Sequence, residues 1–140
     1  MFVDASAIIA ILTGEPDGEA FAKAIDASAH PVSSVLAVFE ATVGLFRKKT
    51  MPMQEADAAV QAFIEAARIT VLPIADTDRP AAFAAFERYG RHRHPDTDRN
   101  RALNLADCFH YATAKNNGVP ILSKDIGFAL TDVQVVSVGA

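Results

Sequence analysis

Cysteine is almost absent from the sequence, and this scarcity excludes several classes of protein. The single Cys108 cannot form an internal disulfide framework or build a cysteine-based zinc site. Together with a start that does not look like a secretion signal, it predicts a reducing, cytoplasmic setting. Long hydrophobic runs are also missing, because the longest apolar stretches, residues 5–12 and 35–39, fall far short of the about 20 residues that cross a bilayer. We therefore expect a soluble protein with no membrane contact.

An excess of basic residues and a glycine-rich phosphate loop are absent as well. Acids outnumber bases by 17 to 13, so the overall charge does not indicate a polyanionic partner, although a local basic patch could still serve one. The first apolar run is followed by "DASA" rather than by glycines, which disfavours a dinucleotide-binding module. The sequence also lacks repeats and linkers. Its 140 residues, 51% of them hydrophobic, fit one domain over residues 1–140.

What the sequence does contain is an alternation of short apolar runs and amphipathic segments. Strands are predicted at residues 1–3, 30–33, 69–74, 119–123 and 133–138. Helices are predicted at residues 5–12, 17–26, 33 or 34 to 49, 52–68, 76–89 and 104–117. The β-branched run "ITVLPI" is expected to be a buried strand. Strands separated by helices predict an α/β fold, with a parallel β-sheet flanked by α-helices on both faces.

Four carboxylates are expected to gather at one rim of that sheet. Asp4 and Asp125 each follow a predicted strand, and ligands of such sheets bind at the carboxyl ends of the strands. Asp107 lies in the first turn of its helix, where the helix dipole stabilises an anion. Glu40 is the only charged residue between Pro31 and Phe46, in a helix whose apolar side chains should be core: Val35, Val38, Phe39, Val43 and Phe46.

Each acid also has a simpler structural explanation. Asp4 could cap a helix, Asn104 with Asp107 resembles a capping box, and Asp125 could be a turn residue. Glu40 could reach solvent or pair with Arg47. Four acids assigned independently to one rim nevertheless favour a functional cluster. Such a cluster needs a compensating cation, and oxygen ligands suit Mg²⁺ or Mn²⁺, which suits phosphodiester hydrolysis by metal-activated water.

A loop rich in arginine precedes the Asp107 helix. Residues 90–102, "GRHRHPDTDRNRA", show no apolar period and are predicted to be exposed. Its arginines could hold a nucleic-acid backbone: Arg91, Arg93, Arg99 and Arg101. Equally, the loop could be a solvated connection neutralised by Asp96 and Asp98. His92 and His94 are interpreted as phosphate contacts or plain surface, because no third nitrogen or thiol ligand lies near them.

The helix after this loop carries further side chains beside Asp107. His110 and Tyr111 could border the site, but residues at this spacing more often pack. Cys108 and Phe109 are expected in the core.

The chain resembles the PIN-domain ribonucleases, and specifically the VapC-type toxins of bacterial toxin–antitoxin pairs. The motifs that carry the resemblance span nearly the whole chain: "FVDASAIIAIL" with "GEP", Glu40 in its apolar helix, "GRHRHP", "LNLADCFHYATAK" and "VPILSKDIGFALTDV". The resemblance implies a PIN-like fold and a toxin that cleaves RNA. It further implies a homodimer inhibited by a smaller VapB-type antitoxin that wraps it and blocks the acidic pocket.

The resemblance also assigns roles to individual residues. Asp4, Glu40 and Asp107 match the acids that bind Mg²⁺ or Mn²⁺, and Ser6 and Ser123 match the small polar positions that support them. Asp125 matches the fourth acid, but relatives often read Lys-Gly-Asp-Asp-Phe where this chain has "KDIGF", so Asp132 is a second candidate. "DTDRNR", residues 96–101, resembles an insertion.

Other classes of function fit the sequence less well. A haloacid-dehalogenase-like phosphatase would place its second aspartate where Ser6 stands. A receiver-type domain would bind metal without turnover, but Asp76 lies two residues beyond "ITVLPI", which suits a phosphoacceptor poorly. A non-catalytic domain whose acidic rim docks basic helices remains an alternative to the ribonuclease.

Overall fold

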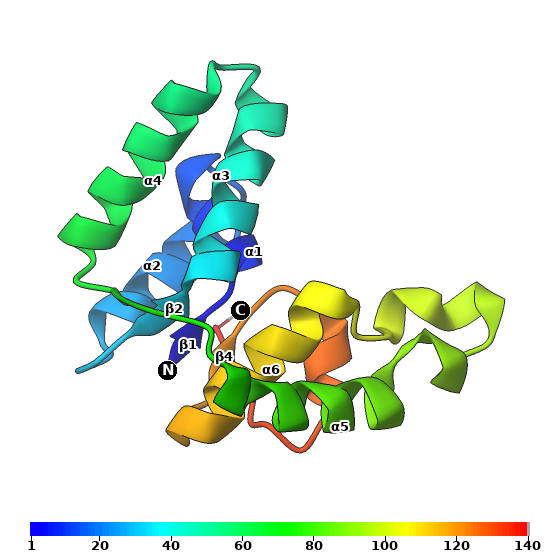
Figure 1. Ribbon diagram of the computed structural model, residues 1–140. Helices are drawn as coiled ribbons and strands as arrows, with labels where there is room; N and C mark the ends of the chain where they lie inside the picture. Colours follow the sequence, from blue (N-terminus) through cyan, green and yellow to red (C-terminus); the bar gives the residue numbers. More distant parts are fainter. Residues whose placement is uncertain (140) are drawn as a thin grey trace.

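A four-stranded parallel sheet with strand order β3-β2-β1-β4 organises the computed structural model of the protein, which describes residues 1–139 (Figure 1). The strands are short: β1 Phe2–Val3, β2 Val32–Ser34, β3 Thr70–Leu72 and β4 Ile121–Leu122. Phe2 lies between Val32 on one side and Ile121 on the other. The first strand of the chain therefore sits inside the sheet, and the parallel α/β fold expected from the sequence is confirmed.

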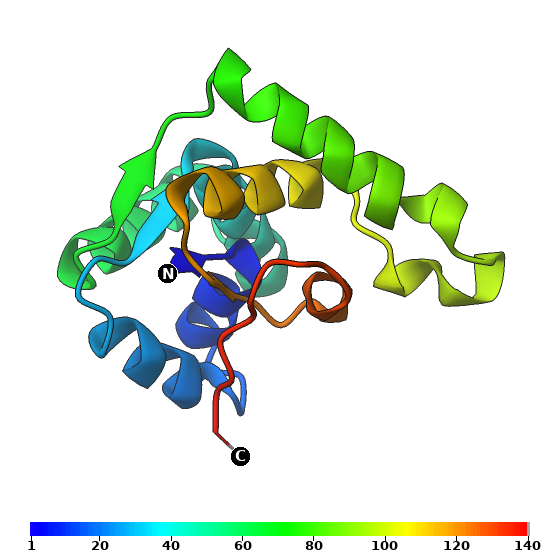
Figure 2. The ribbon, with the colours of Figure 1, turned by 90° about the horizontal axis from the view of Figure 1, so that it is seen from below.

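Helices cover both faces of this sheet within residues 1–139 (Figure 2). Their bounds are α1 Ala5–Leu12, α2 Gly18–Asp26, α3 Val35–Lys49, α4 Met53–Ala66, α5 Arg79–Tyr89 and α6 Leu105–Asn117. Val3 packs with α1 to α4 in one buried cluster, whereas Phe2 packs with α5 and α6 in the other. Consecutive strand residues point to opposite faces, so these two side chains begin two separate cores.

Local capping fixes where the helices next to the carboxyl ends of the strands begin. Ser34 ends β2, and its Oγ accepts a hydrogen bond from the backbone N–H of Ala37, which starts α3. Asn104 and Asp107 form a capping box at the start of α6. Gly118 ends α6 with a left-handed φ of 63°, a conformation that glycine adopts without strain.

Two of the predicted strands differ from the structure. The run 69–74 forms the edge strand β3, and Val71 is 36% exposed rather than buried, because only β2 pairs with this strand. Residues 133–138 do not form a strand. They meet the sheet through one parallel bridge between Ile121 and Val135, with backbone hydrogen bonds on either side of it. Their β-branched composition matched a strand, but their pairing with β4 is limited to this one bridge.

The core face of α3 was also predicted wrongly. The exposed fractions of Val35, Phe39 and Phe46 are 58%, 64% and 39%, and among the five residues expected in the core only Val38 is buried. The helix packs through a narrower stripe of smaller residues that includes Ala37, Ala41 and Leu45. Large apolar side chains are thus left on the surface of α3. None of the helices in residues 1–139 is long and apolar enough to cross a membrane.

Candidate active site

Asp4 is held at the carboxyl end of the sheet by the backbone and by two serine hydroxyls. Its N–H donates to the carbonyl of Leu122, at 3.0 Å, which ties the end of β1 to β4. Its Oδ2 accepts hydrogen bonds from Ser6 Oγ, at 2.6 Å, and from Ser123 Oγ, at 2.7 Å. The side chain is buried, so these bonds fix the orientation of its carboxylate. Its other oxygen, Oδ1, is left facing α6.

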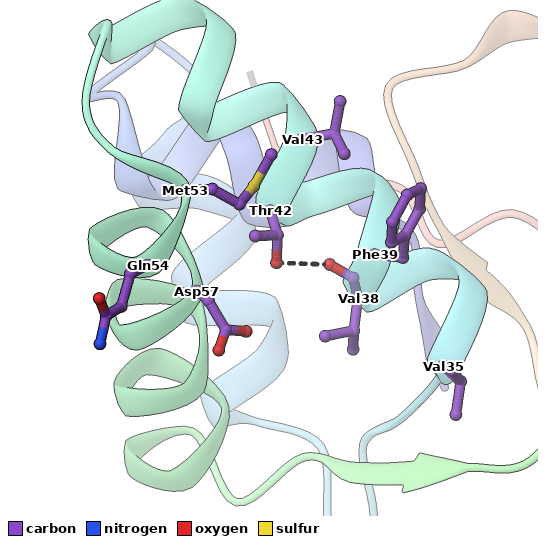
Figure 3. A pocket seen from close by; sticks show the side chains of 8 residues that line it. All are labelled: Val35, Val38, Phe39, Thr42, Val43, Met53, Gln54 and Asp57. Atoms are coloured by element: carbon purple, nitrogen blue, oxygen red, sulfur yellow. Dashed lines mark hydrogen bonds between the residues drawn. The ribbon is translucent and has the colours of Figure 1, made fainter.

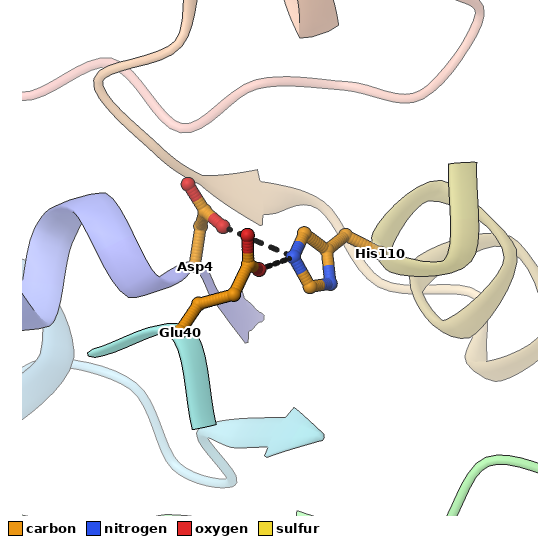
Figure 4. A group of neighbouring side chains, drawn as sticks. All are labelled: Asp4, Glu40 and His110. Atoms are coloured by element: carbon orange, nitrogen blue, oxygen red, sulfur yellow. Dashed lines mark hydrogen bonds and ion pairs between the residues drawn. The ribbon is translucent and has the colours of Figure 1, made fainter. Parts of the chain in front are cut away.

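Glu40 and His110 complete the centre of this site (Figure 4). Glu40, in the second turn of α3, points to His110 of α6, and the Nε2 atom of His110 hydrogen-bonds its Oε1. The same Nε2 lies 3.7 Å from Oδ1 of Asp4. Glu40 therefore pairs with His110 and not with Arg47. His110 is 1% exposed and packs on the ring of Phe2, with ring centroids 5.5 Å apart.

His110 is the site residue that the sequence interpretation undervalued. Its spacing on the helix predicts mainly a packing role, whereas the structure places it between two of the expected acids. The available signal was its spacing of three residues from Asp107, which puts both side chains on one face of α6. The aromatic and apolar residues around His110 are typical of a packed helix face, so the spacing alone did not indicate a site residue. Its Nδ1 atom is buried and has no hydrogen-bond partner among the described residues.

Asp107 has both a structural and an electrostatic role. Its Oδ2 accepts from the N–H of Asn104 at 3.0 Å, and its own N–H donates to Asn104 Oδ1 at 2.8 Å. The capping-box explanation is therefore correct as far as it goes. Yet burial, followed by the charges of Asp125 and Asp4, raises the pKa of Asp107 to about 7. Asp107 therefore lies close enough to Asp4 and Asp125 for their charges to act on it.

Asp125, and not Asp132, lies with the other acids. Its N–H donates to Ser123 Oγ at 2.9 Å, and its Oδ1 accepts from the N–H of Gly127 at 2.8 Å. Burial and the charge of Asp4 raise the pKa of Asp125. Asp132 is exposed and is occupied elsewhere, by the hydroxyl of Tyr111 and the ammonium of Lys115, each at 2.6 Å.

The electrostatics of the cluster show that its acids attract positive charge. Burial lowers the pKa of His110, but the hydrogen bond to Glu40 and the charges of Asp4, Glu40 and Asp107 outweigh this, so the net pKa is raised. One ligand atom from each of Asp4, Glu40 and His110 can be chosen so that all lie within 4.8 Å of one another. That separation, and the mixture of carboxylate and imidazole donors, fits a single divalent ion.

The arginine loop is exposed, as expected, and is partly neutralised. It contains two short 3-10 turns, Arg91–Arg93 and Asp96–Arg101. Arg99 pairs with Asp96 at 2.5 Å and Arg101 with Asp98 at 3.6 Å. Arg93 donates to the carbonyl of Glu87 at 2.9 Å, as His92 also can from its Nε2. These pairs favour the solvated-connection interpretation for Arg99 and Arg101 more than for Arg91 and Arg93.

An apolar groove lies between α3 and α4 (Figure 3). The side chains that line it are Val35, Val38, Phe39, Thr42, Val43, Met53, Gln54 and Asp57. A second apolar surface lies on α5 and α6, where Phe83, Phe86 and Leu105 are 62%, 51% and 78% exposed. Cys108 is buried beneath this second surface, as predicted, and Phe109 is half-buried.

Comparisons with known proteins place this fold and site in context. The profile of the PIN domain family matches residues 1–134. Ribonuclease VapC of Mycolicibacterium smegmatis is 32% identical over 136 residues, which cover 97% of this chain and 99% of that protein. Ribonuclease VapC30 of Mycobacterium tuberculosis is 30% identical over 137 residues, which cover 98% of each.

Two solved structures share the fold. One is a toxin–antitoxin complex from Klebsiella pneumoniae, with a TM-score of 0.67 at 20% identity, covering 99% of this chain and 97% of that one. The other is VapC20 of Mycobacterium tuberculosis, described as a toxin that cleaves the sarcin–ricin loop, with a TM-score of 0.70 at 17% identity over 96% and 97% of the two chains.

Proposed function

The chain belongs to the PIN domain family, and from this premise we propose that it is a metal-dependent endoribonuclease that serves as the toxin of a toxin–antitoxin pair. The observation that carries the proposal is the convergence of Asp4, Glu40 and His110 from three separate elements, with Asp107 and Asp125 close enough to Asp4 to feel its charge. Buried acids that raise one another's pKa destabilise the folded chain unless a cation joins them. A divalent ion, Mg²⁺ or Mn²⁺, is the proposed cofactor.

The proposed role of each acid follows from its burial and its hydrogen bonds. Asp4 is rigid because two hydroxyls and the sheet hold it, so it is the proposed anchor of the ion. Asp107 and Asp125 each commit one oxygen to a backbone N–H and leave the other for the ion or its waters. When bound, the ion would lower the pKa of a water molecule and offset charge on the phosphate. Glu40, whose side chain is 33% exposed, is placed to accept a proton at the solvent side.

The proposed substrate is RNA, and the proposed setting is the cytoplasm. The names of the two curated relatives described above contain the word ribonuclease, which supports RNA as the substrate class. Arg91 and Arg93 lie on the exposed loop before α6 and carry no carboxylate partner among residues 1–139, so they are the better candidates to bind the phosphate backbone. Arg99 and Arg101 would first have to leave Asp96 and Asp98.

The proposed protein partner is a VapB-type antitoxin, seated in the groove between α3 and α4. The names of the relatives and the toxin–antitoxin complex among the similar structures support such a partner. Phe39, which lines the groove and is 64% exposed, is the proposed main contact for the antitoxin. We further propose a homodimer, in which the surface of Phe83, Phe86 and Leu105 is covered by a second copy.

Purified protein, free of antitoxin, tests the activity directly. We expect it to cleave structured RNA in the presence of Mg²⁺ or Mn²⁺, and we expect EDTA to stop cleavage. The matched control is Asp4→Asn, which keeps the size of the side chain and removes the charge; it should be inactive while its circular dichroism spectrum is unchanged. Cleavage that persists in EDTA, or in the Asp4→Asn variant, would refute the proposed mechanism.

A further inference from the structure

His110 has no structural requirement to be a histidine. Its ring is 1% exposed in the core beneath the sheet, and Nδ1 has no hydrogen-bond partner among the described residues. Leaving a buried polar atom unpaired costs about 1–3 kcal/mol. The polar contacts of the ring are all made by Nε2, and both are with acids of the cluster, Glu40 and Asp4. The contacts with the acidic site, and not the packing of α6, therefore explain why position 110 is a histidine.

We propose that His110 supplies a nitrogen ligand to the divalent ion of this site, and that this nitrogen makes the site select transition-metal ions such as Mn²⁺ over Mg²⁺. The inference rests on the proposed metal-dependent function and specifies which ion it uses. Imidazole nitrogen favours transition-metal ions, whereas a site made only of carboxylates and water serves Mg²⁺ equally well. The side chain at position 110 would then set the metal preference of a site whose acids alone would not.

The distances are compatible with shared ligation. Two ligands that each bind one ion at about 2.1 Å are about 3.0 Å apart when adjacent in an octahedron and about 4.2 Å apart when opposite. Nε2 of His110 and Oδ1 of Asp4 are 3.7 Å apart, within that range. Glu40 and His110 are closer because a hydrogen bond joins them directly. Glu40 is the partner that can move aside, since its side chain is one-third exposed while Asp4 and His110 are buried.

Spectroscopy of the wild-type protein tests the ligand without relying on a variant that might misfold. Mn²⁺ is paramagnetic, and an electron spin echo measurement detects a nitrogen bonded to it. We expect coupling to ¹⁴N in the wild-type complex, replaced by ¹⁵N coupling when the histidines are labelled with ¹⁵N. The other histidines are His30, His92 and His94, none of which lies in the cluster. Asp4→Asn is the control, because it retains all four histidines but loses the proposed anchor.

Binding measurements test the selectivity. We expect calorimetric titrations to show that His110→Gln lowers the ratio of Mn²⁺ to Mg²⁺ affinity about tenfold or more, mainly through weaker Mn²⁺ binding. Glutamine keeps a polar side chain of similar length and can still donate to Glu40, but it has no imidazole nitrogen. A role limited to positioning Glu40 would therefore leave the ratio unchanged in this variant, and the inference would be wrong.

The outcomes separate this inference from the function on which it rests. Absence of nitrogen coupling, in a protein that still binds Mn²⁺ through Asp4 and cleaves RNA, would overturn the role of His110 alone. Metal binding that survives Asp4→Asn, together with cleavage in EDTA, would overturn the proposed function itself. Nitrogen coupling that disappears in Asp4→Asn supports both.

Discussion

At the scale of single residues, each aspartate of the site uses one carboxylate oxygen for local hydrogen bonds and leaves the other free for the proposed ion. Asp4 gives Oδ2 to Ser6 and Ser123, and Asp107 gives Oδ2 to the N–H of Asn104. Asp125 gives Oδ1 to the N–H of Gly127. In each case one oxygen fixes the side chain as a cap or anchor, and the second is left without a local backbone or hydroxyl donor. The structural and functional interpretations of these acids are therefore compatible.

Asp107→Asn should stabilise the metal-free protein at pH 8. The pKa of Asp107 is raised from 3.8 to about 7 in the fold, so the folded state holds a proton that the unfolded state releases between these values. Wild-type stability should therefore fall as pH rises from about 4 to 7, by at most about 4 kcal/mol at about 1.4 kcal/mol per pKa unit. Urea unfolding at pH 4 and pH 8, without metal, measures this.

The asparagine can still accept the hydrogen bond from Asn104, so the cap is preserved in Asp107→Asn. Asp107→Ala removes the cap as well and should be less stable than Asp107→Asn by about 1 kcal/mol. Saturating Mg²⁺ or Mn²⁺ should reverse the order at pH 8, because the ion stabilises the wild type and not the variant. A wild-type stability that does not depend on pH between 4 and 8 would contradict the raised pKa.

Ser123→Ala should reduce kcat by about 10- to 100-fold with little change in stability. The substitution removes the hydroxyl that donates to Asp4 and accepts from the N–H of Asp125, so both acids lose a positioning contact. Steady-state cleavage of a short RNA measures the effect. Ser137→Ala, at an exposed position near the end of the chain, is the matched control and should be neutral. A change confined to KM would point to substrate binding instead.

Sequence reasoning singled out Asp4, Asp107 and Asp125 because each stands at the end of a strand or the start of a helix, and Glu40 because it is a lone charge in an apolar helix. The ranking of Asp125 over Asp132 needed the structure, because the chain after β4 turns Asp132 toward Lys115 and Tyr111. His110 was undervalued for a related reason. Its contact with Glu40 joins residues 70 positions apart, on two helices whose relative rotation no local pattern specifies.

At the scale of elements, α3 shows how apolar side chains can mislead. A helix that is apolar on most of its surface does not indicate which face is buried. Here the stripe with Ala37, Ala41 and Leu45 allows close packing, and the larger side chains of Val35 and Phe39 remain outside. In contrast, α6 was predicted well, because a capping box and a terminal glycine mark both of its ends.

The arginine loop gives an element-scale prediction. Substitution of Arg91, Arg93, Arg99 and Arg101 by alanine should weaken RNA binding and make it less dependent on salt. Each lost phosphate contact should reduce the slope of log K against log salt by about 0.7 for a single strand. Because these side chains would position the backbone, saturating RNA should largely restore the cleavage rate, which it cannot do for Asp107→Asn.

The pairs within the loop allow a sharper version. The double variant of Arg91 and Arg93 should account for most of the lost slope, since Arg99 and Arg101 already have carboxylate partners. Fluorescence anisotropy at several salt concentrations measures the slopes. If all four arginines can be removed with an unchanged slope, the loop is only a solvated connection, and the metal site is unaffected by that result.

At the scale of the whole molecule, two apolar surfaces are exposed on different helices, and two partners are proposed for them. Phe39→Asp, on α3, should weaken antitoxin binding about tenfold or more while leaving the mass of the free protein in solution unchanged.

Phe86→Asp, on α5, should convert the proposed dimer to a monomer and leave antitoxin binding largely intact. Sedimentation measures the mass, and titration with purified antitoxin measures the binding. A wild type that is already monomeric at micromolar concentration would exclude the dimer.

The position of β1 inside the sheet has a consequence for the order in which the site folds. Asp4 depends on partners far along the chain, because the Ser123 hydroxyl that orients it is 119 residues away and β1 pairs with β4. A chain in which residues 121–125 have not yet joined the sheet has an open edge along β1 and no Ser123 hydroxyl beside Asp4. The acidic site is thus assembled only when β4 docks, so a partly folded chain in which β4 is still detached lacks an ordered metal site.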